Sequence, residues 1–313
     1  MPLPADEKLI ELSESILSTF SKIFGDHPGV RPAHAKGTLL NGAFVPSAAA
    51  AELSKAPHFR RDSTPVVVRF SDSTGLPNIP DADPNALPKG LAVRFILGDR
   101  VHTDIISHST DGFPTRTGEE FLELLEAQAS SDPANLAGSP LETFLGSHPA
   151  ALRFVQQPKP FPASFARESF FGVTALEFIN AAGESRFGRY RIIPEAGNEY
   201  IDESVAQSQD ADYLFTELTE RLGSGPIRFT LAVQLADDSD IVDDATVHWP
   251  ADREVREVGT LELTGPVADN AAQQQHIIFD PIPRVEGIEP SADPLLELRA
   301  AVYLISGRRR RTA

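Results

Sequence analysis

The chain has no cysteine among its 313 residues. That absence excludes disulfide bonds, thiolate-bound metal ions, iron–sulfur clusters and cysteine nucleophiles. Long hydrophobic runs are also missing, since no apolar stretch approaches the roughly 20 residues that a membrane-spanning helix needs. The N-terminus, from Met1 to Lys8, is acidic and interrupted by prolines, which is not the pattern of an export signal. We therefore expect a cytoplasmic protein.

Positive charge is scarce as well. The chain carries 28 lysines and arginines against 45 acidic residues, so its formal net charge is −17 at pH 7. Phosphate backbones and anionic lipid headgroups repel a protein of that charge, and we expect no nucleic-acid or membrane partner. Hydrophobic residues make up 41% and charged residues 23%, which is typical of a globular protein.

The spacing of apolar residues predicts many strands. Residues 64–71 alternate, with Val68 and Phe70 on one face and Arg69 and Ser71 on the other. Further strands are predicted at 91–97, 170–180, 186–194, 227–235 and 259–264. Helices are predicted at 5–24, from the capping box at 117 onward, at 210–222 and at 294–305, ending before Gly307.

Consecutive strands without helices between them indicate an antiparallel sheet or barrel with helices added at its ends. The chain has no repeat, linker or abrupt change in composition. We therefore expect an α+β fold in a single domain over residues 1–313, with residues 1–28 as an N-terminal helical arm. The apolar stripe of that arm offers a contact for a homodimer.

Arg299 and Tyr303 are four residues apart on the last predicted helix, so they share a face. A guanidinium beside a phenol favours the phenolate, which is an oxygen ligand able to hold ferric iron. In the simpler interpretation, Tyr303 is an amphipathic core residue and Arg299 is a surface charge. The second arrangement is common on helices, so the spacing alone leaves both open.

His34 lies in a loop of small residues without apolar periodicity, where an imidazole can serve as a general base or simply face solvent. Arg69 and Ser71 lie on one face of an otherwise apolar strand. Two polar groups pointing the same way in a barrel strand indicate a polar ligand or partner inside, unless that face is wet.

His102 and Asp104 allow a different chemistry. Two positions apart on a strand, they face the same way, and two histidines with one carboxylate form the site of non-haem iron enzymes. His148, His248 or His276 could supply the third ligand. His-x-Asp also arises by chance in an Asp-rich chain with 8 histidines, so this site is kept as an alternative.

Five segments carry a family signature when taken in order. They are the Arg-x-x-His-Ala-Lys-Gly loop at 31–37, the strands at 68–71 and 90–95, the pair Trp249-Pro250 and the ending at 287–303. Together they resemble the haem catalase superfamily, specifically its short members, the catalase-related peroxidases. The resemblance runs from about Arg31 to Arg310. It implies an antiparallel eight-stranded β-barrel with flanking helices and a buried haem b.

The resemblance also implies roles on the two sides of that haem. Tyr303 matches the iron ligand and Arg299 the residue that keeps it ionised; tyrosine ligation is the known catalase arrangement. His34 matches the distal histidine, which moves a proton between the two oxygens of hydrogen peroxide. Ser71 matches the hydroxyl that fixes the His34 ring.

Further residues match groups that hold the porphyrin. Arg31 and Arg69 match partners of the haem propionates, as does Arg308 or Arg310 in the C-terminal arginine run. Phe121 matches an aromatic that stacks on the porphyrin. Phe113 matches a second wall residue.

The chain departs from the larger catalases at their distal asparagine. The sequence after Asp104 places Ser109 or His108 opposite that position, and the strand register decides between them. A hydroxyl at Ser109 would hold peroxide less well than an amide does. This implies a peroxidase that consumes hydrogen peroxide or organic hydroperoxides with small organic reductants and has weak catalase activity. Ala33, where allene-oxide-forming relatives carry threonine, argues against that rearrangement.

A haem carrier or sensor without catalysis remains the main alternative, because it would use the same pocket. The pairing of His34 with Ser71 favours the enzyme, since carriage alone does not need an oriented base. The non-haem iron enzyme at His102 and Asp104 is the less favoured alternative.

Overall fold

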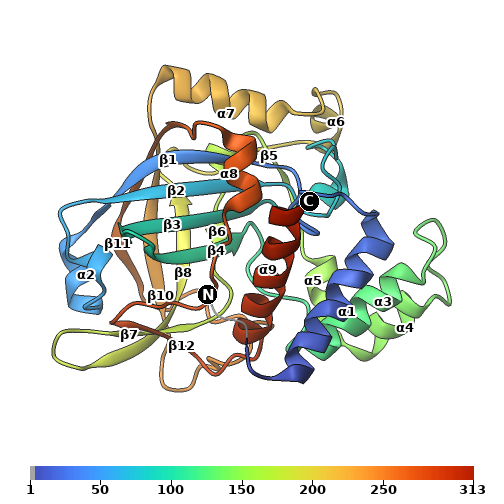
Figure 1. The fold of residues 1–313 in the computed structure, drawn as a ribbon, viewed down its shortest axis with the longest axis horizontal. Helices are drawn as coiled ribbons and strands as arrows, with labels where there is room; N and C mark the ends of the chain where they lie inside the picture. The colour runs from blue at the N-terminus through green and yellow to red at the C-terminus, as the bar shows by residue number, and fades with distance from the viewer. Residues whose placement is uncertain (1–3) are drawn as a thin grey trace.

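The computed structural model describes residues 4–313 and is built around a closed β-barrel (Figure 1). Eight strands form an antiparallel ring in the order β10-β11-β1-β2-β3-β4-β6-β8, and β8 pairs with β10 to close it. The strands are β1 (Gly37–Pro46), β2 (Thr64–Ser71), β3 (Gly90–Gly98), β4 (Val101–His108), β6 (Phe170–Phe171), β8 (Ser185–Pro194), β10 (Ile227–Leu235) and β11 (Val255–Pro266). The predicted α+β fold with an eight-stranded barrel is confirmed.

Four short strands lie outside the ring. β7 (Leu176–Ile179) pairs with β8, and β12 (Ile288–Pro290) pairs with β7. β5 (Phe161–Pro162) and β9 (Tyr200–Ile201) form a separate two-stranded sheet.

The barrel interior is packed with phenylalanine rings. Phe70 on β2 lies 6.0 Å from Phe229 on β10, a strand that is not its neighbour in the ring, so both rings point inward. Because side chains alternate along a strand, Arg69 and Ser71 point outward. The polar ligand site predicted inside the barrel is therefore on its outer wall. That face is not wet, since Arg69 is 3% and Ser71 4% exposed.

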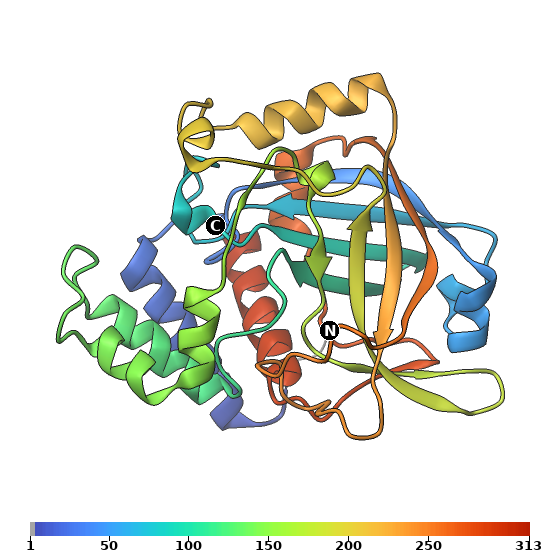
Figure 2. The ribbon, with the colours of Figure 1, turned by 180° about the vertical axis from the view of Figure 1, so that it is seen from behind.

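Helices cover the outside of the barrel. α9 (Leu295–Thr312) runs along the barrel wall, between the strands and a group of helices on one side (Figures 1 and 2). That group is α1 (Glu7–Phe24), α3 (Gly118–Ala129), α4 (Pro140–Ser147) and α5 (Pro149–Gln156). The remaining helices are α2 (Ala48–Leu53), α6 (Glu203–Ala206), α7 (Tyr213–Ser224), α8 (Asn270–His276) and the short 3₁₀ turns η1 (Pro57–Phe59), η2 (Pro84–Ala86) and η3 (Phe165–Arg167).

The apolar stripe of α1 is used within the chain. Ile16 and Leu17 are buried in one cluster with Leu298 and Val302 of α9. This stripe is therefore not available for the subunit contact that the sequence suggested. Residues 1–3 of the predicted arm lie outside the described residues.

α9 does not end at Gly307 as predicted but continues to Thr312. Gly307 lies against Ile278, and a Cβ at this position would collide with that side chain. The glycine thus allows a close approach and does not mark a helix end. The extra turns carry Arg310 back to the wall, where it is 5% exposed.

Local signals set the start of α3. The Thr117 hydroxyl accepts a hydrogen bond from the backbone N–H of Glu120 at 3.2 Å, as the predicted capping box requires.

In the described part of the chain, no helix is both long enough and apolar enough to span a membrane.

One core residue is chemically unusual. His58 on η1 is fully buried, and its ring lies 4.5 Å from those of Phe59 and Phe95. Neither ring nitrogen has a hydrogen-bond partner among the described residues. Burial, with a smaller contribution from Arg61, lowers the pKa of His58 to about 3.

We predict that His58→Leu makes the protein less sensitive to acid. Below pH 6.5, the usual pKa of histidine, His58 binds a proton in the unfolded chain but stays neutral in the folded protein. The free energy of unfolding therefore falls as the pH falls. Removing one such group should flatten that dependence by up to about 1.4 kcal/mol per pH unit between about pH 4 and 6. Urea unfolding at several pH values measures it. Equal slopes for the variant and the parent would contradict the prediction.

Candidate active site

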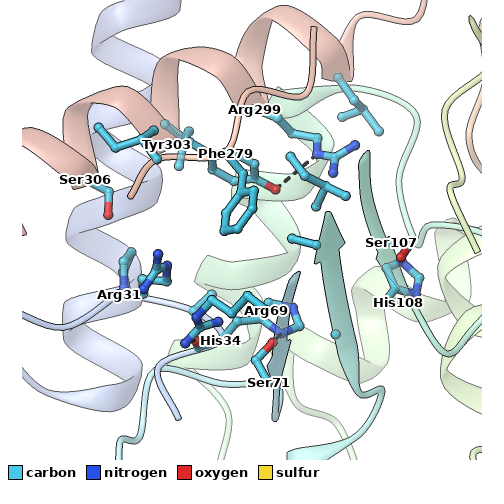
Figure 3. A pocket seen from close by; sticks show the side chains of 18 of the residues that line it. Arg31, His34, Arg69, Ser71, Ser107, His108, Phe279, Arg299, Tyr303 and Ser306 are labelled. Atoms are coloured by element: carbon cyan, nitrogen blue, oxygen red, sulfur yellow. Dashed lines mark hydrogen bonds between the residues drawn. The ribbon is translucent and has the colours of Figure 1, made fainter. Parts of the chain in front are cut away.

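A cavity of about 250 Å³ lies between α9 and the outer wall formed by β2, β3 and β4. Arg299 and Tyr303 come from α9 on one side, while His34, Arg69 and Ser71 lie across from them (Figure 3). Apolar residues of α1, α3 and α9 complete the walls. Candidate residues that lie far apart in the sequence thus meet in one cavity, although Trp249 and Pro250 of the family signature do not line it.

The helix side of the cavity follows from helical geometry. Arg299, Tyr303, Ser306 and Arg310 all line it, at successive spacings of four, three and four residues. The Arg299 Nε donates a hydrogen bond to the Tyr303 hydroxyl oxygen at 3.2 Å. A charge-assisted hydrogen bond of this kind fixes the position of a tyrosine oxygen, which can serve as a metal ligand.

The strand side holds an oriented imidazole. His34 Nδ1 lies 3.1 Å from Ser71 Oγ, and the His34 backbone has a φ of 53°, in the left-handed region. Arg69 holds this backbone in place by donating to the His34 carbonyl at 2.9 Å. Gly90 makes room for the ring, since a Cβ there would lie 2.8 Å from His34 Nδ1.

The His34 ring is neutral at physiological pH. Burial, together with the positive charge of Arg69, lowers its pKa to about 4. With Nδ1 occupied by Ser71, Nε2 has no hydrogen-bond partner among the described residues. The arrangement leaves an uncharged imidazole with one free nitrogen beside the cavity, as a general base requires.

Three arginines at one end of the cavity donate to carbonyl and amide oxygens and not to carboxylates of the described chain. Arg31 donates to the carbonyls of Gln274 and Ile277, and Arg310 donates to Ile277 at 2.7 Å. Arg69 donates to the Gln274 side chain at 3.0 Å. Within residues 4–313, none of the three pairs with a carboxylate.

This arginine cluster (Arg31, Arg69 and Arg310) is costly without a ligand. Burial and mutual repulsion lower the pKa of Arg69 to about 9, and burial beside Arg311 lowers that of Arg310 to about 10. Unpaired buried cations are unfavourable, so the cluster calls for a bound anion. A ligand that carries carboxylates at one edge would satisfy it.

Two residues predicted for the site lie outside the cavity lining. Arg308 is exposed, because it comes two residues before Arg310 and so lies on the opposite side of α9. Ser109 Oγ accepts a hydrogen bond from the backbone N–H of Lys89 at 3.0 Å. His108 lines the cavity instead, which settles the strand register that the sequence left open.

The two predicted aromatics do line the cavity. The rings of Phe113 and Phe121 lie 5.3 Å apart on the side next to α1 and α3. Sequence reasoning missed the segment from Gln274 to Phe279, whose carbonyls position the arginine cluster. Backbone acceptors carry no residue-type signal, so no pattern in the sequence points to them.

The alternative iron site at His102 and Asp104 is wrong. Both Asp104 oxygens are engaged, by Arg94 at 2.9 and 2.6 Å and by the backbone N–H of Asp280 at 2.7 Å. Across the part of the chain that the structure describes, no three His, Asp or Glu side chains group as a metal site. His148, one proposed third ligand, stacks on Phe144 at 3.9 Å.

The comparisons with known proteins agree with the geometry. A family model described as Catalase matches residues 26–313. A catalase-related peroxidase of Mycolicibacterium paratuberculosis is 37% identical over 90% of this chain and 89% of its own length. A catalase-related peroxidase of Synechococcus elongatus is 33% identical over 94% of this chain and 87% of its own. A catalase of Pseudomonas aeruginosa is 29% identical, and the match covers 55% of that longer protein.

Solved structures show the same fold. A fungal catalase superposes with a TM-score of 0.80 at 22% identity, covering 99% of this chain and 63% of that one. A bacterial catalase gives 0.79 at 24% identity, with 99% and 62% covered. The resemblance that the five sequence segments indicated is confirmed, together with a peroxidase or catalase type of enzyme. The chain therefore belongs to the catalase family.

Proposed function

We propose that the protein is a peroxidase that uses haem b to reduce hydrogen peroxide, or organic hydroperoxides, with electrons from small organic donors. Weak catalase activity would accompany it. One observation carries the proposal: the Arg299–Tyr303 pair faces the His34–Ser71 pair across an apolar cavity that ends in the arginine cluster.

The residues present fit a haem. Tyr303 offers an anionic oxygen for the iron, and the arginine cluster offers partners for two propionates. Phe113, Phe121 and Val302 give the apolar walls that a porphyrin ring needs. A bound haem would supply a redox-active iron that peroxide can oxidise.

The protein's own residues handle the proton. Neutral His34 would take a proton at Nε2, the nitrogen not engaged by Ser71, from one oxygen of the hydroperoxide and return it to the other. That oxygen would then leave as water from hydrogen peroxide, or as the alcohol from an organic hydroperoxide. Ser71 holds the ring so that this nitrogen stays directed to the substrate. Arg299 donates a hydrogen bond to the Tyr303 oxygen, which would hold that oxygen in position for the iron. A small organic donor then supplies the two electrons that complete the cycle.

Two features favour peroxidase over catalase action. The relatives at 37% and 33% identity are catalase-related peroxidases that match nearly the whole chain. His108 also lines the cavity, and the resemblance implies an amide at this position in larger catalases, so a second peroxide would be held differently here. A haem carrier would need the cavity but not the His34–Ser71 pair. The charge of −17 supports an enzyme without nucleic-acid or membrane partners.

The first prediction from the proposed function concerns Tyr303 as the iron ligand. Tyr303→Phe keeps the ring but removes the oxygen, so the variant should lose stoichiometric uptake of haemin and the ferric Soret band. Absorption titration with haemin measures both. If the parent protein itself took up no haemin, the proposed function would be wrong.

The second prediction concerns the base. His34→Ala should retain haem but react with peroxide roughly 10²–10⁴-fold more slowly. Ser71→Ala should slow the reaction with peroxide about tenfold, as expected for one lost hydrogen bond of about 1.4 kcal/mol. Stopped-flow absorption gives both rates. An unchanged rate for His34→Ala would remove His34 from the reaction.

The third prediction concerns the propionates. Arg310→Leu should speed haem release by about 10–100-fold, because a hydrogen bond to a charged group contributes about 1.5–3 kcal/mol. Arg308→Leu is the matched control, since Arg308 is exposed on the same helix and should release haem at the parent rate. Haem transfer to excess apomyoglobin measures release. Equal rates for the two variants would contradict the assignment.

A further inference from the structure

A second cleft adjoins the cavity at the end where the arginine cluster lies. Its volume is about 370 Å³. Five residues line both spaces, namely Phe20, Arg31, Pro32, Ser306 and Arg310. Arg31 and Ser306 lie at the opposite end of the cavity from His108 (Figure 3). A molecule in this cleft would therefore reach the carboxylate edge of a bound haem without passing His108.

The cleft is open to solvent and has apolar walls. It is formed by the end of α1, the loop that follows α1 and the end of α9. Asp26 and Arg309 on its rim are exposed, so a molecule can enter from outside. Leu17, Val30 and Pro32 are apolar lining residues. Walls of this kind suit a small organic ring.

The cleft also contains a histidine with one free nitrogen. His27 Nε2 lies 3.0 Å from the backbone carbonyl oxygen of Phe24. A carbonyl only accepts, so Nε2 carries a proton and donates it. Nδ1 has no hydrogen-bond partner among the described residues, and in the neutral ring it is an acceptor. The backbone N–H of Val30 donates to the His27 carbonyl at 3.1 Å, which holds the turn that carries this ring.

The charges around the cleft favour a neutral ligand. Arg309 pairs with Glu14, while Arg31 and Arg310 belong to the cluster that would hold the propionates. Asp26 adds a negative charge at the rim. An anion would therefore find no spare cation among the described residues of this lining. It would also be repelled by the net charge of −17.

We propose that this cleft binds a neutral phenol as the electron donor and that His27 Nδ1 accepts the proton of the phenol. The apolar walls suit its ring, and the free nitrogen suits its hydroxyl. This inference rests on the proposed function, which leaves the class of the donor open. It names that class and a place where the donor binds apart from the hydroperoxide.

The step balances in protons and electrons. The O–H bond of the phenol breaks, its proton goes to His27 Nδ1, and one electron crosses the shared wall to the haem that hydrogen peroxide has oxidised. A phenoxyl radical leaves. Two phenols restore the two electrons that one hydrogen peroxide removes. Their two protons, passed from His27 to solvent, balance the two taken up as both peroxide oxygens become water.

The first measurement needs no haem. In ¹⁵N NMR of the haem-free protein, p-cresol should shift the Nδ1 resonance of His27. The ether 4-methylanisole has the same ring without the hydroxyl proton and should leave that resonance in place. Equal shifts, or none, would overturn the proposal whether or not the protein takes up haem. Tighter binding of 4-hydroxybenzoate than of p-cresol would overturn the choice of a neutral phenol.

The second measurement places the donor near the iron. In the haem-loaded ferric protein, the iron should enhance the NMR relaxation of p-cresol protons. Ser21→Phe fills the cleft from a residue that does not line the cavity, and should weaken p-cresol binding at least about tenfold. Ser21→Leu replaces it if the larger ring prevents haemin uptake. Ser18→Phe is the matched control, because Ser18 is exposed on the same helix and lines neither space. Equal relaxation in the Ser21 and Ser18 variants would contradict binding in this cleft.

The third measurement isolates the proton. Ferrocyanide gives an electron without a proton, so the ratio of the p-cresol rate to the ferrocyanide rate reports proton acceptance. His27→Phe should lower that ratio about 10²-fold. His276→Phe is the matched control, since His276 is exposed, lines neither space and also contacts a backbone carbonyl, at 2.7 Å. An unchanged ratio in His27→Phe would remove His27 from the step. Failure of the parent to take up haemin would instead remove the proposed function, while the phenol contact at His27 would still be measured in the haem-free protein.

Discussion

The candidate site depends on the close contact of α9 with the outer wall of the barrel. One helix supplies Tyr303, the guanidinium of Arg299 that donates to it and one member of the arginine cluster, all from a single face. Their mutual placement is set by the helical repeat, so it survives only if the helix stays straight and near the strands. Gly307 permits that approach by leaving space for Ile278. A small residue in the helix therefore determines whether Arg310 reaches the cavity.

The two ends of the cavity differ in charge. The end nearest Arg31 is positive and buried, while the distal wall carries two imidazoles that burial keeps neutral. A ligand with carboxylates on one edge can enter in only one orientation without leaving cations unpaired. The same field lowers the basicity of His34, because Arg69 lies against its backbone. Arg69 thus belongs both to the arginine cluster and to the surroundings that lower the pKa of His34, in which burial is the larger cause.

Much of this was readable in the sequence, and the failures have physical causes. Period-two alternation predicted β2, β3, β8 and β10 but not β1 or β4, and the spacing of Arg299 and Tyr303 predicted a shared helix face that the structure reproduces. The helix end at Gly307 was wrong because a tertiary contact with Ile278 outweighs the local preference of glycine. Ser109 was misplaced because one residue of register reverses a strand's faces. The backbone carbonyls near Gln274, which accept hydrogen bonds from the arginine cluster, could not be predicted, because every residue type carries a carbonyl.

Alternate residues of β2 face the phenylalanine-filled interior of the barrel and the cavity outside it. On β2, Val68 and Phe70 hold the fold together, while Arg69 and Ser71, their immediate neighbours, face the chemistry. A substitution at Arg69 or Ser71 changes the cavity wall without opening the barrel core, and one at Val68 or Phe70 does the reverse. Reactivity on this wall can thus diversify during evolution while the scaffold stays unchanged.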